Sequence, residues 1–173
     1  MPQFETARLT CLSLTPAQYT IFENGQEPQW EGFTNPYQHL IVGPSPMVHR
    51  IPRVKADPGF ADLGLFLAIN KETKEIIGSF GFHDRPDERG MIEIGYGIVP
   101  EMQNQGFGTE MLLGAWRWIA QNPEVKILRY TVSPDNAPSL HIVKKLGLDL
   151  VGEQWDEEDG LELIFETASS TYH

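Results

Sequence analysis

The spacing of apolar and polar residues changes several times along the chain and divides it into segments. Residues 4 to 14 alternate as a strand, with an apolar side chain facing inward at nearly every second position. Thr15 to Gln18 has the pattern of a capping box with a proline at the first helical position, which predicts a short helix to about Gly25. Residues 28 to 60 hold six of the thirteen prolines, interleaved with aromatic residues, and predict short helical turns and loop.

The rest of the chain has clearer periods. From Gly64 it predicts three antiparallel strands, the last over residues 91 to 99. Apolar residues at helical spacing predict two helices, over residues 107 to 121 and 137 to 146. Three further strands are predicted over residues 126 to 132, 148 to 154 and 161 to 167. Gly147 is placed to cap the second helix, and residues 168 to 173 are expected to fray.

Strand 91 to 99, helix 107 to 121 and strand 126 to 132 form a β-α-β unit. Its two strands should therefore lie parallel, with a right-handed crossover. Ligands of such units bind beyond the carboxyl ends of the strands. The segment PEMQNQGFGTEM, from Pro100 to Met111, lies there.

Length and charge narrow the function classes. The 173 residues fit one domain, 1 to 173, and the longest apolar runs are too short for a membrane span. The net charge of −11 argues against nucleic-acid binding, agrees with a solvated acidic surface, and only weakly favours a cationic substrate. The N-terminus lacks a signal-like segment and Cys11 is the single cysteine, so a cytoplasmic location is expected.

Two glycines stand at the mouth of the first long helix. A helix start leaves four backbone N–H groups unpaired, and Gly106 and Gly108 would let an anion approach them. A glycine-rich helix entry without a ligand explains the pattern equally well. The dinucleotide pattern G-x-G-x-x-G fails because its third position is Met111, and no GxxxxGK[ST] motif is present.

The remaining pattern, Gln103-x-x-Gly106-x-Gly108, resembles the acyl-CoA signature of the GNAT superfamily of N-acyltransferases. EIGYGIVPEMQNQGFGTEML, the helix start Asn136 to Ser139, the exit Lys145 to Leu148 and the opening FETARLTCLSLTP resemble the branch that includes the ribosomal-protein alanine N-acetyltransferases. The resemblance covers most of 1 to 15 and 64 to 167, and is poor in 28 to 60.

The resemblance implies an α/β (α+β) fold: a mixed, mostly antiparallel central sheet with one parallel pair splayed around the cofactor, and helices on both faces. It implies acetyl-CoA as cosubstrate, bound by Ile98, Val99, Gln103, Asn104, Gln105, Gly106, Phe107, Gly108, Thr109 and Asn136. Asn104 and Gln105 stand where the family often has Gly and Lys, so the turn carries no cation and its affinity should rest on backbone N–H groups.

Two further glycines lie inside the strand before the turn. Gly95 and Gly97 are costly in a strand, and the resemblance implies a bulge there that splays it and lets the pantetheine arm pair with backbone around Ile98 and Val99. Packing under a bulky neighbour such as Trp116 is the alternative.

Acyl transfer to an amine needs a neutral nucleophile and a stabilised leaving thiolate. Glu93, and Glu158 or Glu157, are the candidate bases, although each could equally be a solvated surface residue. The resemblance places Ser139 at the leaving sulfur, while Asn136 is the better helix cap. The five histidines lack ligand spacing, so no metal is expected.

The sequence therefore predicts a transferase: an acetyl-CoA-dependent N-acetyltransferase that acts directly on a primary amine, with a protein N-terminal α-amine among the candidates. A small amine, such as a polyamine, amino acid or antibiotic, is the alternative acceptor. A non-catalytic acyl-CoA-binding domain is the alternative function. Segment 28 to 60 should shape the acceptor side, and a homodimer, common in the resembled branch, stays open.

Overall fold

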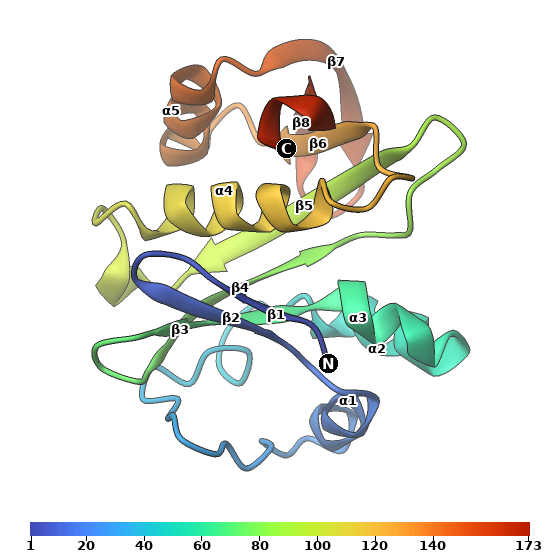
Figure 1. The fold of residues 1–173 in the computed structure, drawn as a ribbon. Helices are drawn as coiled ribbons and strands as arrows, with labels where there is room; N and C mark the ends of the chain where they lie inside the picture. The colour runs from blue at the N-terminus through green and yellow to red at the C-terminus, as the bar shows by residue number, and fades with distance from the viewer.

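One eight-stranded sheet runs through the computed structural model, which describes residues 1–173 (Figure 1). Its strands lie in the order β1-β2-β3-β4-β5-β6-β8-β7. Their bounds are β1 Gln3–Glu5, β2 Leu9–Ser13, β3 Phe66–Asn70, β4 Ile76–Phe82, β5 Met91–Ile98, β6 Ile127–Val132, β7 Asp149–Asp156 and β8 Gly160–Ala168. Only β5 and β6 pair in parallel, which confirms the predicted β-α-β unit and the mostly antiparallel sheet.

Helices cover both faces of this sheet, as predicted. They are α1 Pro16–Glu23, α2 Met47–Ala56, α3 Ala61–Gly64, α4 Phe107–Ile119 and α5 Ala137–Leu146, with short 3-10 turns at Pro58–Phe60, Pro100–Met102 and Ser169–Tyr172. Figure 1 shows α4 lying along β5, with α5 on one side and the first three helices grouped on the other.

Strand alternation sends neighbouring residues into two separate apolar cores. In β3, Phe66 and Ala68 belong to the core beneath α4, whereas Leu67 and Ile69 belong to the core beneath α1 and α2. Because both faces are covered, β3 and β4 are buried throughout and show no polar positions facing solvent.

The segment predicted as one strand, 4 to 14, is instead a hairpin. The strands β1 and β2 pair antiparallel, and the Thr6 N–H donates to the Leu9 carbonyl at 2.9 Å. The chain turns here because the side chains of Thr6 and Arg8 hydrogen-bond to Glu110 in α4. The hairpin thus carries Arg8 to the start of α4.

The proline-rich segment is more regular than predicted. Residues 28 to 46 are irregular, but α2 forms a ten-residue helix that contains Pro52. Its buried side chains, Met47, Arg50 and Val54, lie on one face. The helix contacts α1 and α3, and Met47 and Val54 belong to the core beneath α1 and α2. Because Pro52 has no N–H, the carbonyl of Val48, four residues earlier, lacks its partner in the helix. The proline is tolerated because Val48 is exposed to water.

The last residues do not fray. Ser169 is buried and donates its hydroxyl to the Val125 carbonyl at 2.8 Å. The ring of Tyr172 lies 5.2 Å from that of Trp116, centroid to centroid. The aromatic contact holds the C-terminal turn against α4, so the prediction for 168 to 173 was wrong.

The parallel strands part at the level of Gly95. Their last pair is Ile94 with Tyr130; beyond it β5 continues beside β4, and β6 continues beside β8. The register between β4 and β5 runs without a shift from Phe82 to Gly78, so this splay occurs without the predicted bulge against β4. Gly95 lies beside His83 and not under Trp116.

Gly81 sets the distance between β4 and α3, and its replacement should be costly. A Cβ at Gly81 would lie 2.0 Å from the Gly64 carbonyl oxygen, which is backbone and cannot swing away. We expect Gly81→Ala to lower the free energy of unfolding by about 1–3 kcal/mol. Gly152→Ala is the control, because nothing lies within 4 Å of a Cβ there. Equal denaturant midpoints for the two variants would contradict this account.

Candidate active site

The turn before α4 presents a row of unpaired backbone N–H groups. The Gln103 N–H donates to the Pro100 carbonyl at 3.3 Å, and the Glu110 N–H donates to the Gly106 carbonyl at 3.1 Å. Between them, the six N–H groups from Asn104 to Thr109 have no acceptor in the protein. Such a row at a helix start forms a concave site for an anion.

Two residues of this turn have left-handed backbone. Gly106 has φ of 83° and Asn104 has φ of 62°. Glycine adopts this conformation at no steric cost, and asparagine is among the residues that tolerate it best. Gly108 has a different role, because a Cβ there would lie 3.3 Å from Cε2 of Tyr96.

Arg8 brings positive charge to the turn from the N-terminal hairpin. Its Nη1 donates to the Gln105 carbonyl at 3.0 Å, its guanidinium carbon lies 3.9 Å from the ring centroid of Phe107, and its Nε forms an ion pair with Glu110 at 2.7 Å. The turn itself carries no Lys or Arg, so the cation beside it comes from a distant part of the chain. Nothing in the local motif signals Arg8, which lies 97 residues from Gln105.

A cavity of about 560 Å³ opens between this turn and α5. Of the residues predicted to bind the cofactor, those that line it are Ile98, Gln103, Asn104, Gly106, Phe107, Gly108, Thr109 and Asn136. Ser139 lines it as well, together with Tyr96, Gly97 and Lys145. The cavity therefore brings the turn and the start of α5 together.

Val99 and Gln105 do not line this cavity. The Val99 N–H already donates to the Ile77 carbonyl at 2.9 Å, because this residue pairs toward β4. The Ile98 carbonyl accepts from Nε2 of Gln103 at 2.9 Å. Neither the Val99 N–H nor the Ile98 carbonyl is therefore free to pair with a pantetheine arm. Because backbone groups of successive strand residues point to opposite sides, the Ile98 N–H points toward the gap beside β6.

Three hydroxyl groups meet at the inner end of the cavity. The Asn136 side chain caps α5 by accepting from the Ser139 N–H at 3.1 Å, which fixes the position of Ser139. The Tyr130 hydroxyl donates to Ser139 Oγ at 2.8 Å, and the ring of Tyr96 stacks on that of Tyr130. Burial raises the pKa of Tyr130 and of Tyr96, so both phenols stay protonated at neutral pH.

The predicted carboxylates do not line this cavity. Glu93 Oε2 is 2.6 Å from Nδ1 of His83 and 3.3 Å from Oγ1 of Thr131. Glu158 lies at the tip of the β7–β8 hairpin, where its side chain is 71% exposed and 3.4 Å from Nε2 of His49. The structure does not bring Glu158 and Glu93 into contact.

A second pair on the face of Glu93 involves the proline-rich segment. Nε2 of His39 lies 2.8 Å from the hydroxyl of Ser79, which is opposite Gly97 in the β4–β5 register. Burial lowers the pKa of His39 to about 4, so this imidazole is neutral at physiological pH. His39 and His83 were missed because histidines were considered only as metal ligands.

Aromatic residues of the same segment divide between the cores. Trp30 and Phe33 stack with ring centroids 5.5 Å apart and pack against the core beneath α1 and α2. Tyr37 packs against the other core, and its hydroxyl donates to Glu75 at 3.3 Å. Core packing therefore accounts for all three.

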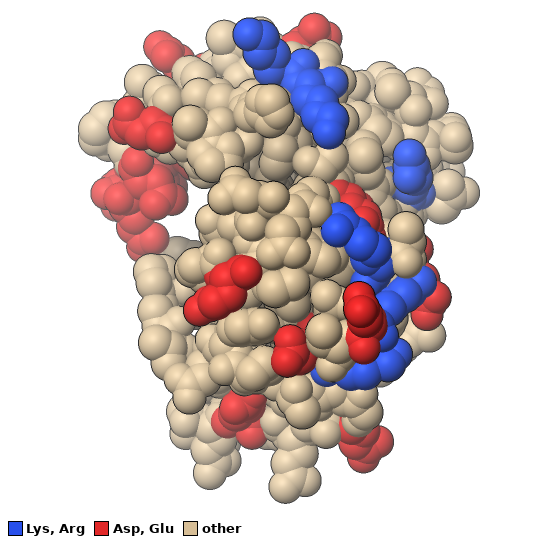
Figure 2. Space-filling model, turned by 90° about the vertical axis from the view of Figure 1, so that its left-hand side faces the viewer, with Lys and Arg blue, Asp and Glu red and all other residues tan.

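Charge is unevenly distributed around this end of the molecule. Figure 2 looks onto the side where α4 and α5 begin, and shows Lys and Arg side chains at the top and right. A group of Asp and Glu side chains lies at the left edge beside a hollow (Figure 2). Among the cations, Lys145 lines the cavity and Arg8 lies against the turn, in a chain of net charge −11.

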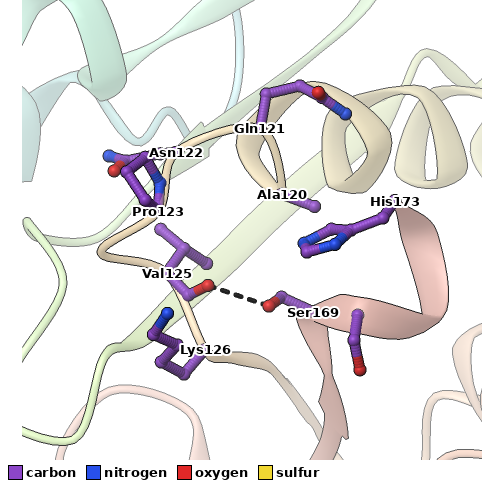
Figure 3. A pocket seen from close by; sticks show the side chains of 9 residues that line it. Ala120, Gln121, Asn122, Pro123, Val125, Lys126, Ser169 and His173 are labelled. Carbon is purple, nitrogen blue, oxygen red and sulfur yellow. Dashed lines mark hydrogen bonds between the residues drawn. The ribbon is translucent and has the colours of Figure 1, made fainter.

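Another cavity, of about 430 Å³, lies at the opposite end of the β-α-β unit (Figure 3). It is enclosed by the end of α4, the segment before β6 and the C-terminal turn, where Ser169 bonds to Val125. Because it faces the amino end of β6, it is remote from the glycine-bearing turn.

Comparison with known proteins identifies the family. A model of the acetyltransferase (GNAT) domain matches residues 29–149. YoaA of Bacillus subtilis, described as an uncharacterized N-acetyltransferase, is 30% identical over 155 residues, which cover 87% of this chain and 85% of YoaA. YjdG of the same organism, also an uncharacterized N-acetyltransferase, is 31% identical over 49% of this chain, which spans about half (51%) of YjdG. The chain belongs to the GNAT acetyltransferase family, as its sequence predicts.

Solved structures share the fold at low sequence identity. The ribosomal-protein-S5-alanine acetyltransferase of Vibrio fischeri superposes with a TM-score of 0.68 over 100% of both chains at 14% identity. A chimera of the spermidine N-acetyltransferase SpeG of Vibrio cholerae and hSSAT has a TM-score of 0.68 over 96% of this chain and 98% of that chain, at 14% identity. RimL, a ribosomal α-N-protein acetyltransferase in complex with coenzyme A, has a TM-score of 0.67 over 96% and 98%, at 12% identity.

Two further features are absent from the structure. None of the helices has the length and apolar character needed to cross a bilayer. No three His, Cys, Asp or Glu side chains are grouped so that they could hold a metal ion.

The contacts of Glu110 predict a pH dependence of stability. Burial alone would raise the pKa of this carboxyl, but hydrogen bonds from Thr6 and Arg8 and the charge of Arg8 outweigh it and hold the pKa below its usual value. The stabilisation is therefore complete above the unfolded-state pKa of about 4.3 and is lost as pH falls through the lower folded-state pKa.

We expect Glu110→Gln to be less stable than the wild type at neutral pH, with a difference that shrinks in acid below about pH 4. Denaturant unfolding across this range measures it. Glu153→Gln is the control, because Glu153 is exposed and has no side-chain hydrogen bond. A Glu110→Gln difference that stays constant with pH would show that the carboxyl is not held by these contacts.

Proposed function

We propose that this protein transfers an acetyl group from acetyl-CoA directly to a primary amine. The observation that supports this most is the row of six N–H groups without acceptors from Asn104 to Thr109, open to a cavity that also contains Ser139. Each hydrogen bond from such a group to a charged phosphate contributes about 1.5–3 kcal/mol. Several of them suffice for a diphosphate.

Two cations complement these backbone groups. Arg8 is fixed over the turn by Glu110, and Lys145 lines the cavity from the last turn of α5. Acidic residues more than about 8 Å away are largely screened at physiological ionic strength, so the local donors outweigh the net negative charge. The site therefore suits a polyanionic cosubstrate.

Ser139 is the candidate for contact with the leaving sulfur. A serine hydroxyl is too weak an acid to give up its proton fully, but Ser139 lines the cavity, where its hydroxyl can hydrogen-bond a thiolate. We assign it the stabilisation of that thiolate. Transfer needs no covalent enzyme intermediate, because Cys11, the single cysteine, is buried beneath α4 and away from the cavity.

The amine is proposed to approach from the face that carries Glu93. A protein α-amine, with a pKa of about 7.7–8.0, is partly neutral at pH 7 and needs only modest help to lose its proton, whereas an alkyl amine near 10.4 needs more. The α-amine of a protein N-terminus is therefore the first candidate acceptor. Glu158 could assist only if the hairpin tip moved, since its side chain contacts His49.

Binding of acetyl-CoA to the turn can be tested with two glycines of equal backbone conformation. Gly106 has φ of 83° and Gly43, in a remote loop, has φ of 82°. Alanine at either position should cost about 1–2 kcal/mol of strain. Acetyl-CoA should raise the melting temperature of wild type and Gly43→Ala by mass action, and of Gly106→Ala much less. Equal shifts in the two variants would remove the turn from the site.

Acetyl transfer itself is tested by thiol release over a set of acceptors. We expect release of the coenzyme A thiol with primary amines. The relative rates with N-terminal peptides, polyamines and lysine analogues identify the acceptor class. Ser139→Ala should reduce kcat by about tenfold or more and leave acetyl-CoA affinity nearly unchanged, because it removes a bond made mainly in the transition state. Acetyl-CoA stabilisation without thiol release for any amine would favour a non-catalytic binder.

A further inference from the structure

One imidazole lies where the two parallel strands part, on the face away from the cavity. His83 directly follows β4, and its backbone N–H donates to the Glu93 carbonyl at 2.9 Å. A Cβ at Gly95 would lie 2.7 Å from Nε2 of His83. The ring therefore lies against the bare backbone of Gly95, the first β5 residue beyond the last β5–β6 pair.

The two ring nitrogens of His83 have different surroundings. Nδ1 is 2.6 Å from Glu93 Oε2, an oxygen that also accepts from Thr131, so the carboxylate holds the ring with Nδ1 protonated. Nε2 has no hydrogen-bond partner in the protein and lies at Gly95, which precedes the cavity-lining residues Tyr96 and Gly97. A carboxylate that orients an imidazole and leaves its far nitrogen free is the arrangement of a general base.

We propose that His83 is the group that accepts the proton of the attacking amine, and that Glu93 is its positioning residue. This inference rests on the proposed acetyl transfer, and it reassigns the basic role from Glu93 to its partner. The carboxylate keeps the ring in the required tautomer and stabilises the imidazolium that forms.

The chemical step balances without another reactant. The amine nitrogen bonds to the thioester carbonyl carbon and the carbon–sulfur bond breaks, so that coenzyme A leaves as a thiolate beside Ser139. The nitrogen loses one proton to Nε2 of His83, which passes it to water. The thiolate takes one proton from water.

The charged groups around this pair are bound to other partners. Arg53 of α2 pairs with Asp84 at 2.6 Å, Arg85 pairs with Asp57 at 2.8 Å, and Arg129 of β6 pairs with Glu166 of β8 at 2.6 Å. Arg50 of α2 donates to the Gly64 carbonyl and adds positive charge near Glu93. Glu93 is thus the carboxylate available to His83.

The sequence context agrees with a ring held in place. Gly95 is required beside His83 because any side chain would displace the ring, and Gly81, its partner in the β4–β5 register, is required by the approach of α3. The paired glycines Gly95 and Gly81 therefore leave space for the ring of His83 and for an incoming amine.

The test compares kcat as a function of pH for wild type, His83→Gln and Glu93→Gln, using an amine that the wild type acetylates, and measures the acetyl-CoA melting shift of each. We expect His83→Gln to keep the shift, to lower kcat by about 10²-fold or more, and to lose the ascending limb of the pH profile. Glu93→Gln should lower kcat by less than His83→Gln does and keep the ascending limb, because the base itself remains while its orienting partner is lost. His173→Gln, in the remote cavity, should match wild type.

The other outcomes separate the two hypotheses. An unchanged kcat and limb in His83→Gln overturn the role of His83. If Glu93→Gln loses the ascending limb of the pH profile and His83→Gln keeps it, Glu93 is the base and the proposal is wrong. If the wild type releases no thiol with any amine, the proposed acetyl transfer is wrong, and with it the role of His83 as its base. The contact of His83 with Glu93 is not affected by that result. If His83→Gln does not fold, Gly95→Ala serves instead: it should displace the ring and lower kcat while the acetyl-CoA shift remains, and an unchanged kcat in that variant would overturn the proposal.

Discussion

The separation of β5 and β6 after the Ile94–Tyr130 pair is the constraint on which the site depends. Strands that stop pairing inside a sheet leave backbone groups without partners, which is costly unless they are covered. Here each strand keeps one neighbour, since β5 stays on β4 and β6 stays on β8. Gln103 covers one of the remaining carbonyls, that of Ile98. These remaining partners reduce the cost of the backbone groups that the separation of β5 and β6 leaves unpaired.

The two sides of this gap carry opposite kinds of groups. On the side of α4 and α5 lie N–H donors, Arg8 and Lys145, which suit an anion. On the other side lie the carboxylate of Glu93 and two imidazoles, of His39 and His83, which suit an amine and its proton. This separation suits the proposed reaction between a polyanionic thioester and an amine, because each would be attracted to a different side of the sheet.

Locally determined features were predictable from the sequence. The bounds of α5 follow from its Asn136 cap and from Gly147, whose φ is 66°, and the parallel pairing of β5 and β6 follows from the helix between them. Helix α2 was missed because tertiary packing of one apolar face outweighs the cost of Pro52.

Contacts between distant parts of the chain were not predictable. Arg8 reaches the turn before α4 only through the N-terminal hairpin, and the C-terminal turn is held by the contact of Tyr172 with Trp116. The pairing of His83 with Glu93 depends on the register of β4 against β5. Sequence spacing carries no signal of such contacts. For this reason the residues of the turn before α4 could be named from their motif, whereas His83 could not.

Strand alternation explains why the face of β5 on which the amine is proposed to approach is bare at two positions, while its other face is bulky. Ile94, Tyr96 and Ile98 face α4, and the residues between them, Gly95 and Gly97, face the other way. A nitrogen must come within about 3–3.5 Å of the carbonyl carbon before it can attack. Side chains at the two glycines would block that approach from the side of Glu93. A slip of the strand by one residue would turn Tyr96 and Ile98 to this face and close the gap. The register of β5 that builds the core therefore also keeps this face open for the proposed attack of an amine.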